Sequence, residues 1–545
     1  MRIMRCNGLC FIAGFVLLLL FIVLTGHSNQ KNRNDNMGIL RIGTTISQDV
    51  FSINSQEGAF GRMGYNAFVQ ALFVNLDENF ELQPDFMRAW EVKDNKEIIF
   101  TYAANARWHD GLPVTGEDLL FTFALLKEKN TVSSRYIESV ELLAGNRIRV
   151  VLNRPVAYGF LREYAVSLQV YPKHIWEKVE NMTQYQGKDA VIGCGPYRFV
   201  RYDETARVSY YEAVSDYFRG KVSVSKVEVH SFATQEALAA ALKSGQVDAV
   251  YDYSSPIRPT IISWLQGAEN INLGESVNTG NYLLTYGFNS NNTGQLALRQ
   301  AITNALDYAL MAQTIAGKYG EAAGRGIISP GNIGFDPQIP KLGQDINLAN
   351  DQLDQAGYAD IDRDGYRESP DGEQIDLLIT PNCNAKKEIN LRLSEIIRKN
   401  LQAAGLRSHI DYVVARNKKA WQGRVRQKRD YEIYVGYNTP GVARFHTAAY
   451  YMVSPKFGFH WGTCPDEEYA DAFTAMLEAK DKSDYIAAVK NLQRIQAELL
   501  PGVSLAWEKV FYPYRTAKFE GWINYPGWGV INNKTWLHIR PKQGR

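Results

Sequence analysis

The stretch that decides the fold lies near the middle of the chain, where residues 282–294 read YLLTYGFNSNNTG. A short apolar run rich in aromatic residues, followed by Asn, Ser and Gly, is typical of a buried strand that ends in a turn. After the turn, apolar residues recur at steps of four and three: Leu298, Ile302, Ala305, Ala309 and Ala312. This spacing predicts one amphipathic helix packed on a sheet. The segments before and after residues 282–330 read as two different bodies.

The length and charge of the chain bound its class. A chain of 545 residues exceeds what one hydrophobic core supports, so we expect two or more domains. Its 60 basic and 58 acidic residues nearly cancel. The chain therefore lacks the excess of positive charge that is typical of nucleic-acid-binding proteins and of polybasic surfaces that bind membranes.

The N-terminal segment is predicted to direct export. Arg2 and Arg5 precede an uncharged run at residues 9–24, which as a helix would span roughly 24 Å, short of the ~30 Å hydrocarbon core of a bilayer. A signal peptide at residues 1–28 is therefore favoured, with an uncleaved membrane anchor as the alternative. Residues 29–38 read as a polar tether. His27 stands where a lipoprotein would carry its acylated Cys, which argues against lipid anchoring there.

Beyond the leader the chain keeps three cysteines, Cys194, Cys383 and Cys464. Three thiols in a large chain do not make a disulfide framework. We expect unpaired structural cysteines, and a bridge between Cys383 and Cys464 is the alternative.

Residues 106–123 form the most informative short segment and read ARWHDGLPVTGEDLLFTF. Asp110 and Gly111 predict a turn, and Thr115 with Asp118 three residues later predicts a capping box for the helix that follows. The sequence holds no His-Glu-x-x-His, Gly-x-Ser-x-Gly or phosphate-binding P-loop motif. We therefore predict a protein without enzymatic activity and without a cofactor.

The same segment resembles the Trp-x-Asp-Gly-x-Pro-Val-Thr signature of the family 5 extracellular solute-binding proteins, which are receptors of ABC importers for oligopeptides, dipeptides and nickel. The resemblance covers roughly residues 39–530. It continues in order through YPKHIW at 171–176, GCGPYRF at 193–199, AALKSGQVD at 240–248, RQAI at 299–302, ALD at 305–307, AGY at 356–358 and DRDGYRE at 362–368.

The resemblance implies an α/β fold with two lobes, similar to periplasmic binding proteins of class II and of the large peptide-binding type, with two hinge crossings. It places lobe I at residues 39–280 with a subdomain near 123–190, lobe II at 281–503, and a return to lobe I at 504–545. Residues 278–286 would form the first crossing.

The function implied by the resemblance is that of an exported receptor, in the periplasm or on the outer face of the cytoplasmic membrane. It would be a monomer that captures a small peptide or peptide-like solute and delivers it to ABC permease subunits, without a nucleic-acid partner. One alternative is binding of a metal chelate, an opine or another anionic solute by the same mechanism. A second is a membrane-anchored sensor or chaperone-like peptide binder.

The resemblance places the ligand site on the loop after residues 431–436, where Tyr437 takes the position of an aromatic that is typically Trp. The candidate ligand residues are Tyr437, Asn438, Thr439, Arg444 and His446, with Arg135, Tyr136, Gln48 and Phe51 as weaker positional candidates. Peptide-binding members carry an acid just beyond the aromatic for the peptide's α-ammonium. No acid lies between residues 437 and 451, and Arg444 and His446 stand there instead. This favours an anionic group, a carboxylate-rich metal chelate or an uncharged solute, and the alternative is that both side chains simply face solvent.

An acidic turn follows residue 359, where four aspartates match the spacing of a calcium loop: Asp360, Asp362, Asp364 and, at its twelfth place, Asp371, with Gly365 at the sixth. The next segment reads as a strand, whereas an EF-hand would place a helix there. We therefore expect an ordinary acidic connector and no bound metal.

Overall fold

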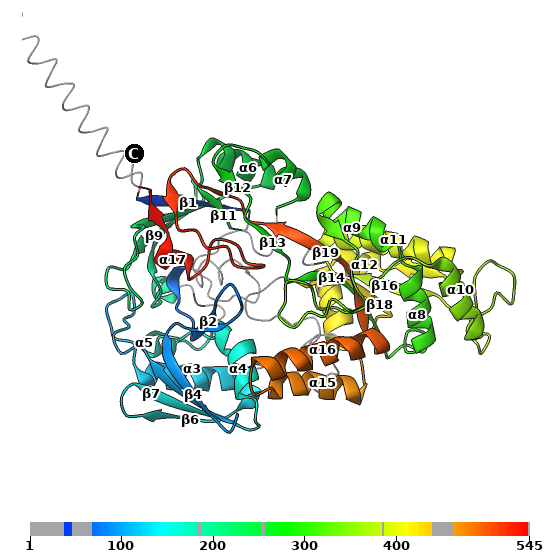
Figure 1. Cartoon of the computed structure of the whole chain (residues 1–545), viewed down its shortest axis with the longest axis horizontal. Helices are drawn as coiled ribbons and strands as arrows, with labels where there is room; N and C mark the ends of the chain where they lie inside the picture. Colours follow the sequence, from blue (N-terminus) through cyan, green and yellow to red (C-terminus); the bar gives the residue numbers. More distant parts are fainter. Residues whose placement is uncertain are drawn as a thin grey trace, which may run out of the picture.

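The computed structural model describes residues 38–45, 68–129, 131, 133–182, 185, 187–251, 257–383, 386–438 and 462–542. Two α/β bodies are visible in Figure 1, with strands running between them. Within the described ranges, no helix is both long and apolar enough to cross a membrane. The predicted leader and tether, residues 1–37, lie outside the described part of the chain.

The first body is built on a seven-stranded sheet in the order β12-β20-β11-β1-β10-β9-β8. Its strands are β1 Ile39–Thr44, β8 Tyr197–Asp203, β9 Val208–Ala213, β10 Lys226–Ser231, β11 Ala249–Val250, β12 Ile271–Asn272 and β20 Tyr514–Arg515. β1 lies parallel to both β10 and β11. The connection from β10 to β11 is helix α6 (Gln235–Ser244), which ends at Gly245 in the left-handed conformation with φ 79°. α7 (Pro259–Leu265) follows, and β21 (Phe519–Glu520), α17 (Thr535–His538) and β22 (Arg540–Pro541) close the chain.

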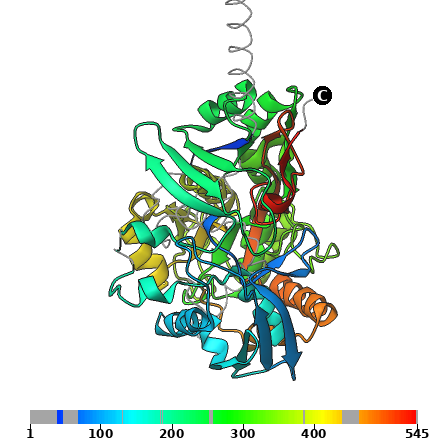
Figure 2. The ribbon, with the colours of Figure 1, turned by 90° about the vertical axis from the view of Figure 1, so that its left-hand side faces the viewer.

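A four-stranded antiparallel sheet forms the subdomain of the first body, in the order β4-β5-β7-β6 (Figure 2). Its strands are β4 Met87–Lys93, β5 Glu97–Tyr102, β6 Ile137–Leu143 and β7 Arg147–Leu152, and it is accompanied by the β2–β3 hairpin (Val74–Leu76 and Leu82–Pro84) and by α3 Gly116–Glu128, α4 Ala157–Glu163 and α5 Lys173–Trp176. The capping box predicted at the start of α3 is confirmed: the Thr115 amide donates to Asp118 Oδ2 at 2.8 Å.

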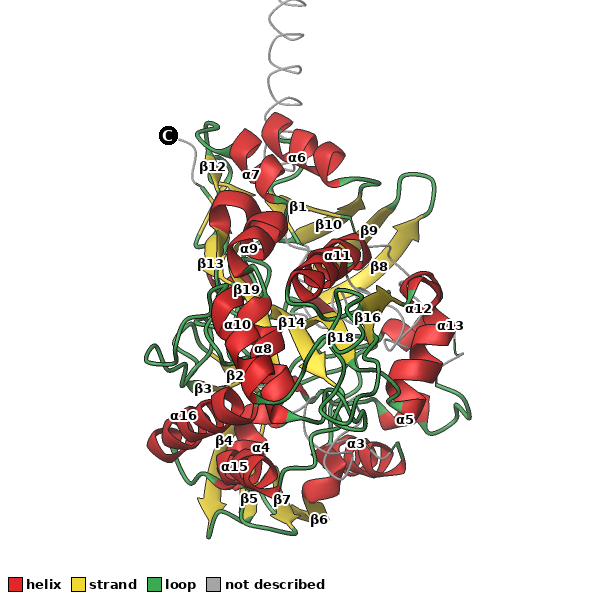
Figure 3. Cartoon of the chain, turned by 90° about the vertical axis from the view of Figure 1, so that its right-hand side faces the viewer, coloured by secondary structure: helices red, strands yellow, loops and turns green. Residues whose placement is uncertain are grey.

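The second body contains the sheet β13-β19-β14-β18-β16-β17, with β15 paired to β19. Its strands are β13 Glu275–Val277, β14 Asn281–Tyr286, β15 Gly320–Glu321, β16 Leu377–Pro381, β17 Ser408–Ile410, β18 Ile433–Asn438 and β19 Gly502–Phe511. Figure 3 shows helices over this sheet, among them α8 Leu296–Ala305, α9 Tyr308–Ala316, α10 Ile346–Gln355 and α11 Lys387–Ala403. α12 (Tyr412–Arg416), α13 (Lys418–Trp421) and a π-helix at Gln422–Lys428 precede β18.

The single helix expected after the opening strand is wrong, because the structure has two helices there. α8 ends at Ala305, and Asp307 begins α9 as its N-cap, with Oδ1 accepting the Leu310 amide at 2.9 Å. Leu298, Ile302, Ala305 and Ala312 are buried as the apolar stripe predicted, but Ala309 is exposed, because α9 starts with its own register after the break. Asp307 competes for the backbone as short acidic side chains do at helix starts.

The chain crosses between the bodies twice. It leaves the first sheet after β12 and enters the second through β13 and β14, and it returns from β19 to β20. β13 and β19 pair antiparallel, with Ser276 opposite Val510, so the two crossings lie side by side (Figure 1). This arrangement confirms the two predicted crossings.

Helices α15 (Glu467–Glu478) and α16 (Lys482–Leu499) pack from the second body onto α4 of the subdomain. The Tyr485 hydroxyl donates to the Glu163 carboxylate, and the Arg162 guanidinium lies 5.0 Å from the Tyr485 ring centroid. The Asn95 side chain donates to the Glu478 carbonyl at 3.0 Å. Apolar residues of both bodies therefore share one buried cluster.

Cys194, Cys383 and Cys464 are all free thiols, so the alternative of a Cys383–Cys464 bridge is wrong.

Candidate functional site

The candidate site lies where the crossing strands meet β18. β14 lies between β18 and β19, and its first residues face the end of β18, with Asn281 opposite Asn438 and Tyr282 opposite Tyr437. All six residues of β14 are buried between its two neighbouring strands and the helices, and this burial holds the strand in place. This part of the opening stretch thus forms one wall of the junction between the two bodies.

Two tyrosine rings form the apolar part of the site. The ring centroids of Tyr282 and Tyr437 lie 4.7 Å apart with the planes tilted by 48°. They are 3% and 6% exposed, and burial raises the pKa of Tyr282 well above its usual value. The Lys386 ammonium, at the start of α11, lies 5.6 Å from the Tyr437 centroid. Tyr437 therefore belongs both to the core of the second body and to the junction.

A polar network joins the two crossings beside these rings. The Asn278 side chain donates from Nδ2 to Glu508 Oε1 at 2.8 Å, and its Oδ1 accepts the Gly280 amide at 2.8 Å. The Asn278 carbonyl accepts from the Ser329 hydroxyl at 2.7 Å. The Tyr437 hydroxyl lies 3.5 Å from Asn278 Nδ2. Asn278 is 1% exposed, so this network fixes the first crossing against the second.

Glu508 is the acidic group of the site. Its side chain is half-buried on β19, and burial raises the pKa of its carboxyl to about 7, while the charge of Lys386 and the hydrogen bond from Asn278 lower that pKa in part. A carboxyl with such a pKa changes between its protonated and its ionised form near neutral pH. Sequence reasoning missed Glu508, although a signal existed: it is the one acidic residue of the apolar segment 502–512.

The nine ligand residues predicted from the sequence fall in three places: the junction, the subdomain and segments outside the described residues. Tyr437 and Asn438 lie at the junction, as described above. Thr439, Arg444, His446, Gln48 and Phe51 lie outside the described residues.

Arg135 and Tyr136 lie at the subdomain, on a 3-10 turn (Ser133–Tyr136). Tyr136 stacks on Tyr164 next to α4, with ring centroids 5.5 Å apart, and Arg135 is exposed. No contact among the described residues links either side chain to the crossing strands.

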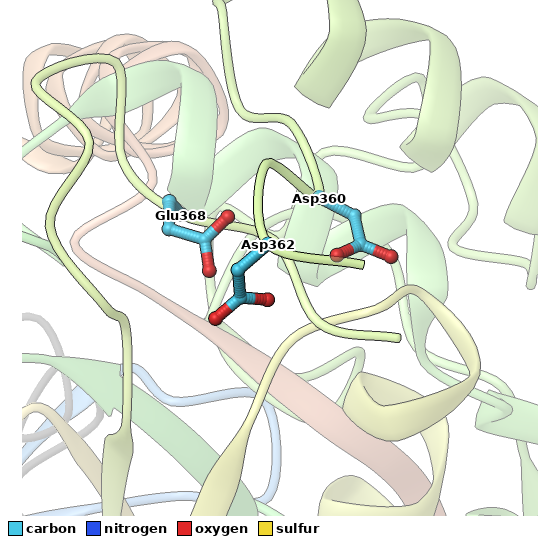
Figure 4. A group of neighbouring side chains, drawn as sticks. All are labelled: Asp360, Asp362 and Glu368. Carbon is cyan, nitrogen blue, oxygen red and sulfur yellow. The ribbon is translucent and has the colours of Figure 1, made fainter. Parts of the chain in front are cut away.

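The acidic turn differs from the calcium-loop pattern. The ligand atoms that come within 4.8 Å of one another belong to Asp360, Asp362 and Glu368 (Figure 4). Asp371 is not part of this group, and Asp364 pairs with Arg407.

The carboxylates of this turn already accept backbone amides: Gly365 donates to Asp360 at 3.1 Å, and Ile361 donates to Glu368 at 2.7 Å. The turn is thus held by its own backbone, in keeping with an acidic connector. The expectation that no metal binds there stays a prediction.

Of the cavities formed by the described residues, one borders the junction and another lies on the first body. One, of about 210 Å³, is lined by residues that include Phe335, Gln493 and Trp507. Because neighbouring residues of a strand point to opposite faces, Trp507 places this cavity across β19 from Glu508. The other, of about 340 Å³, lies beside His109 and Arg198 on the first body. Burial lowers the pKa of His109 to about 4, so that imidazole is neutral at physiological pH.

Comparisons with known proteins agree with the fold. The model of bacterial extracellular solute-binding proteins, family 5 Middle, matches residues 81–459. A Brucella ovis protein named as an ABC transporter peptide-binding protein is 27% identical over 317 residues, and the match spans 54% of either chain, about half the length of that relative. The peptidoglycan-binding protein YepA of Agrobacterium fabrum is 24% identical over 498 residues, covering 80% of this chain and 78% of YepA.

Two solved structures share the architecture. NikZ from Campylobacter jejuni, in complex with Ni(L-His), has a TM-score of 0.71 at 21% identity and covers 92% of this chain and 99% of its own. The oligopeptide-binding protein AppA from Bacillus subtilis, in complex with a nonapeptide, has a TM-score of 0.73 at 16% identity, with 93% and 99% covered. The two-lobed fold expected from the sequence is thereby confirmed.

Proposed function

Because the chain belongs to the bacterial extracellular solute-binding proteins of family 5, we propose that it captures a peptide or peptide-like solute between two lobes and delivers it to an ABC importer. The observation that carries this proposal is the gathering of Tyr282, Tyr437, Asn278 and Glu508 where the two crossings meet. A solute held there would touch both lobes at once. Its contacts would favour the closed arrangement, because a ligand shifts a conformational equilibrium by its differential affinity for the two states.

The proposed lobes are lobe I at residues 39–280, lobe II at 281–503 and the return at 504–545, with the crossing strands β13 and β19 hydrogen-bonded into the sheet of the second body. The receptor acts outside the cytoplasm as a monomer and performs no chemistry on its solute. Its partners are the solute and the permease subunits. The relatives named as peptide-binding support the solute class.

A second candidate is a metal chelate, supported by the similarity to NikZ in complex with Ni(L-His). Glu508 on β19 and the Lys386 ammonium at the start of α11 offer opposite charges, which suits a ligand with both charges, such as a metal–amino-acid complex or a peptide. The two candidates differ in the metal, so a metal analysis of the bound solute separates them.

The test is retention of solute by the purified protein. The protein is mixed with a tryptic digest of casein or with nickel and histidine, passed through gel filtration, and analysed by mass spectrometry and metal analysis. We expect casein peptides to be retained. Retention of nickel and histidine alone would replace peptide with chelate as the solute. Retention of neither would contradict the receptor proposal for these solute classes.

A further inference from the structure

A peptide solute brings a protonated amine into the site, and an ammonium withdrawn from water needs an acidic partner. The family resemblance implies such an acid after the aromatic of β18, but residues 437–451 of this chain contain none. If the proposed function holds, another element must therefore supply the negative charge. Of the described residues at the junction, Glu508 is the acidic one.

The two carboxylate oxygens of Glu508 differ: one accepts a hydrogen bond, and the other accepts none from the described residues. Oε1 accepts the Asn278 side chain at 2.8 Å, which fixes the carboxylate plane. Among the described residues, no hydrogen bond reaches Oε2, and no ion pair joins Glu508 to a cation. The Asn278 amide also donates to the Glu508 carbonyl at 3.1 Å, so strand and side chain are positioned together. Glu508 is intermediate in exposure as a whole residue, and its Oε2 is not among the fully buried, unpaired polar atoms of the described residues.

The groups around Glu508 suit a cation. Tyr282 and Tyr437 are 3% and 6% exposed, so the neighbourhood of the carboxylate is apolar, and attraction between unlike charges is stronger there than in water. The charged and titratable groups that face it among the described residues are Lys386, Tyr282 and, through Asn278, Tyr437. The charge of Lys386 lowers the pKa of Glu508 in part, and its ammonium lies 5.6 Å from the Tyr437 ring centroid.

We propose that Glu508 receives the protonated amine of the solute at Oε2, in place of the acid that this chain lacks after Tyr437. The assignment rests on the proposed function and adds the group that selects for a free amine. It moves the charge recognition from the loop after β18 to the return crossing β19. A ligand amine bound there contacts the strand that joins the lobes.

The protonation behaviour of Glu508 fits this role. Burial raises the pKa of the empty site's carboxyl to about 7. An ammonium at Oε2 would favour the ionised form and lower that pKa again. Binding of a cation at Oε2 and ionisation of the Glu508 carboxyl would therefore favour each other.

The test compares two variants and two peptide pools. Glu508→Gln keeps the shape and the oxygen that accepts from Asn278 but removes the charge. Glu275→Gln is the matched control, since Glu275 is an exposed acid that pairs with Lys509, the residue after Glu508. The pools are the casein digest and the same digest acetylated on its amines. Retained peptides are quantified by mass spectrometry, and circular dichroism verifies folding of both variants.

We expect wild type and Glu275→Gln to retain the free-amine pool at least about tenfold better than the acetylated pool, as a charge-assisted hydrogen bond warrants. Glu508→Gln should lose that preference. Equal retention of both pools by wild type, or an unchanged preference in Glu508→Gln, would overturn the role of Glu508 and leave the receptor function standing. Retention of neither pool by wild type would overturn both.

Discussion

Tyr282 and Tyr437, which lie 155 positions apart in the sequence, stand opposite each other on β14 and β18 with ring centroids 4.7 Å apart. Tyr282 belongs to the segment where the chain first crosses between the bodies. Tyr437 lies one residue before the end of β18, the strand that leads into the predicted ligand loop. Their contact joins the core of the second body to the junction. In the proposed site, this contact would link solute binding to the stability of that core.

The first prediction concerns Tyr437. Because its ring is nearly fully buried, Tyr437→Ala should lower the free energy of unfolding by about 3–5 kcal/mol and weaken solute binding by about 1–3 kcal/mol. Urea denaturation and titration with retained peptides measure the two effects. Tyr437→Phe keeps the ring and should lie within about 1 kcal/mol of wild type in both. If Tyr437→Ala bound solute like wild type, the ring would have no place in the site.

The second prediction concerns the contact between α4 and α15. A Cβ at Gly159 would overlap the Leu477 carbonyl oxygen. Gly159→Ala should therefore push the helices apart and cost about 1–3 kcal/mol of stability, measured by urea denaturation. At Gly423 a Cβ meets nothing within 4 Å, so Gly423→Ala should match wild type or be slightly more stable. Equal stability of both variants would mean that α15 does not pack on α4 in solution.

The third prediction concerns the buried pair Tyr485 and Glu163. Tyr485→Phe removes the hydroxyl that donates to a buried carboxylate and should lower the free energy of unfolding by about 1.5–3 kcal/mol. Arg494→Gln removes an exposed ion pair with Glu498 and should change the free energy of unfolding by less than about 0.5 kcal/mol. A Tyr485→Phe protein as stable as the Arg494→Gln control would contradict the buried contact.

The fourth prediction concerns pH. The Glu508 carboxyl has a pKa of about 7 in the folded protein against 4.5 for the ordinary group. Between these values the folded state binds the extra proton, so Glu508 lowers stability as pH rises from about 4.5 to about 7. Lys386 and Tyr282 are the described charged or titratable groups near it.

Glu508→Gln should therefore gain stability relative to wild type between pH 5 and pH 8, by about 1–3 kcal/mol in the solute-free protein. Urea denaturation at both pH values gives the difference. A difference that stays the same, or that shrinks toward pH 8, is incompatible with a raised pKa at Glu508.

The fifth prediction concerns the acidic turn. Asp364 is paired with Arg407, and Asp360 and Glu368 accept backbone amides, so the turn should fold without a cation. Treatment with EDTA should leave the melting temperature unchanged in calorimetry. If EDTA lowers the melting temperature and added calcium restores it, the carboxylates of Asp360, Asp362 and Glu368 hold a metal ion.

Local chemistry was readable from the sequence where a residue acts on its near neighbours. The Thr115–Asp118 box and the strand Asn281–Tyr286 both depend on short-range patterns, and the structure confirms both of them. The break between α8 and α9 was missed, because apolar spacing outweighed the capping potential of Asp307. The family resemblance, carried by several ordered motifs, supplied the two-lobed fold.

The candidate site was harder to predict, because its decisive contacts span the chain. Asn278 and Glu508 are 230 positions apart, and their hydrogen bond follows from the pairing of β13 with β19, which no local pattern encodes. The same holds for Lys386 beside Tyr437. Sequence reasoning searched for the acid next to the aromatic in the chain, whereas the fold brings one from another strand.

The most direct test of the central claim is a crystal structure of the protein with the peptides that it retains from the casein digest. The account predicts difference density at the junction of the crossings, against the Tyr437 ring and with an amine at hydrogen-bond distance from Glu508 Oε2. Density confined to another place, such as the cavity beside Phe335 and Trp507, with none at the junction, would contradict it.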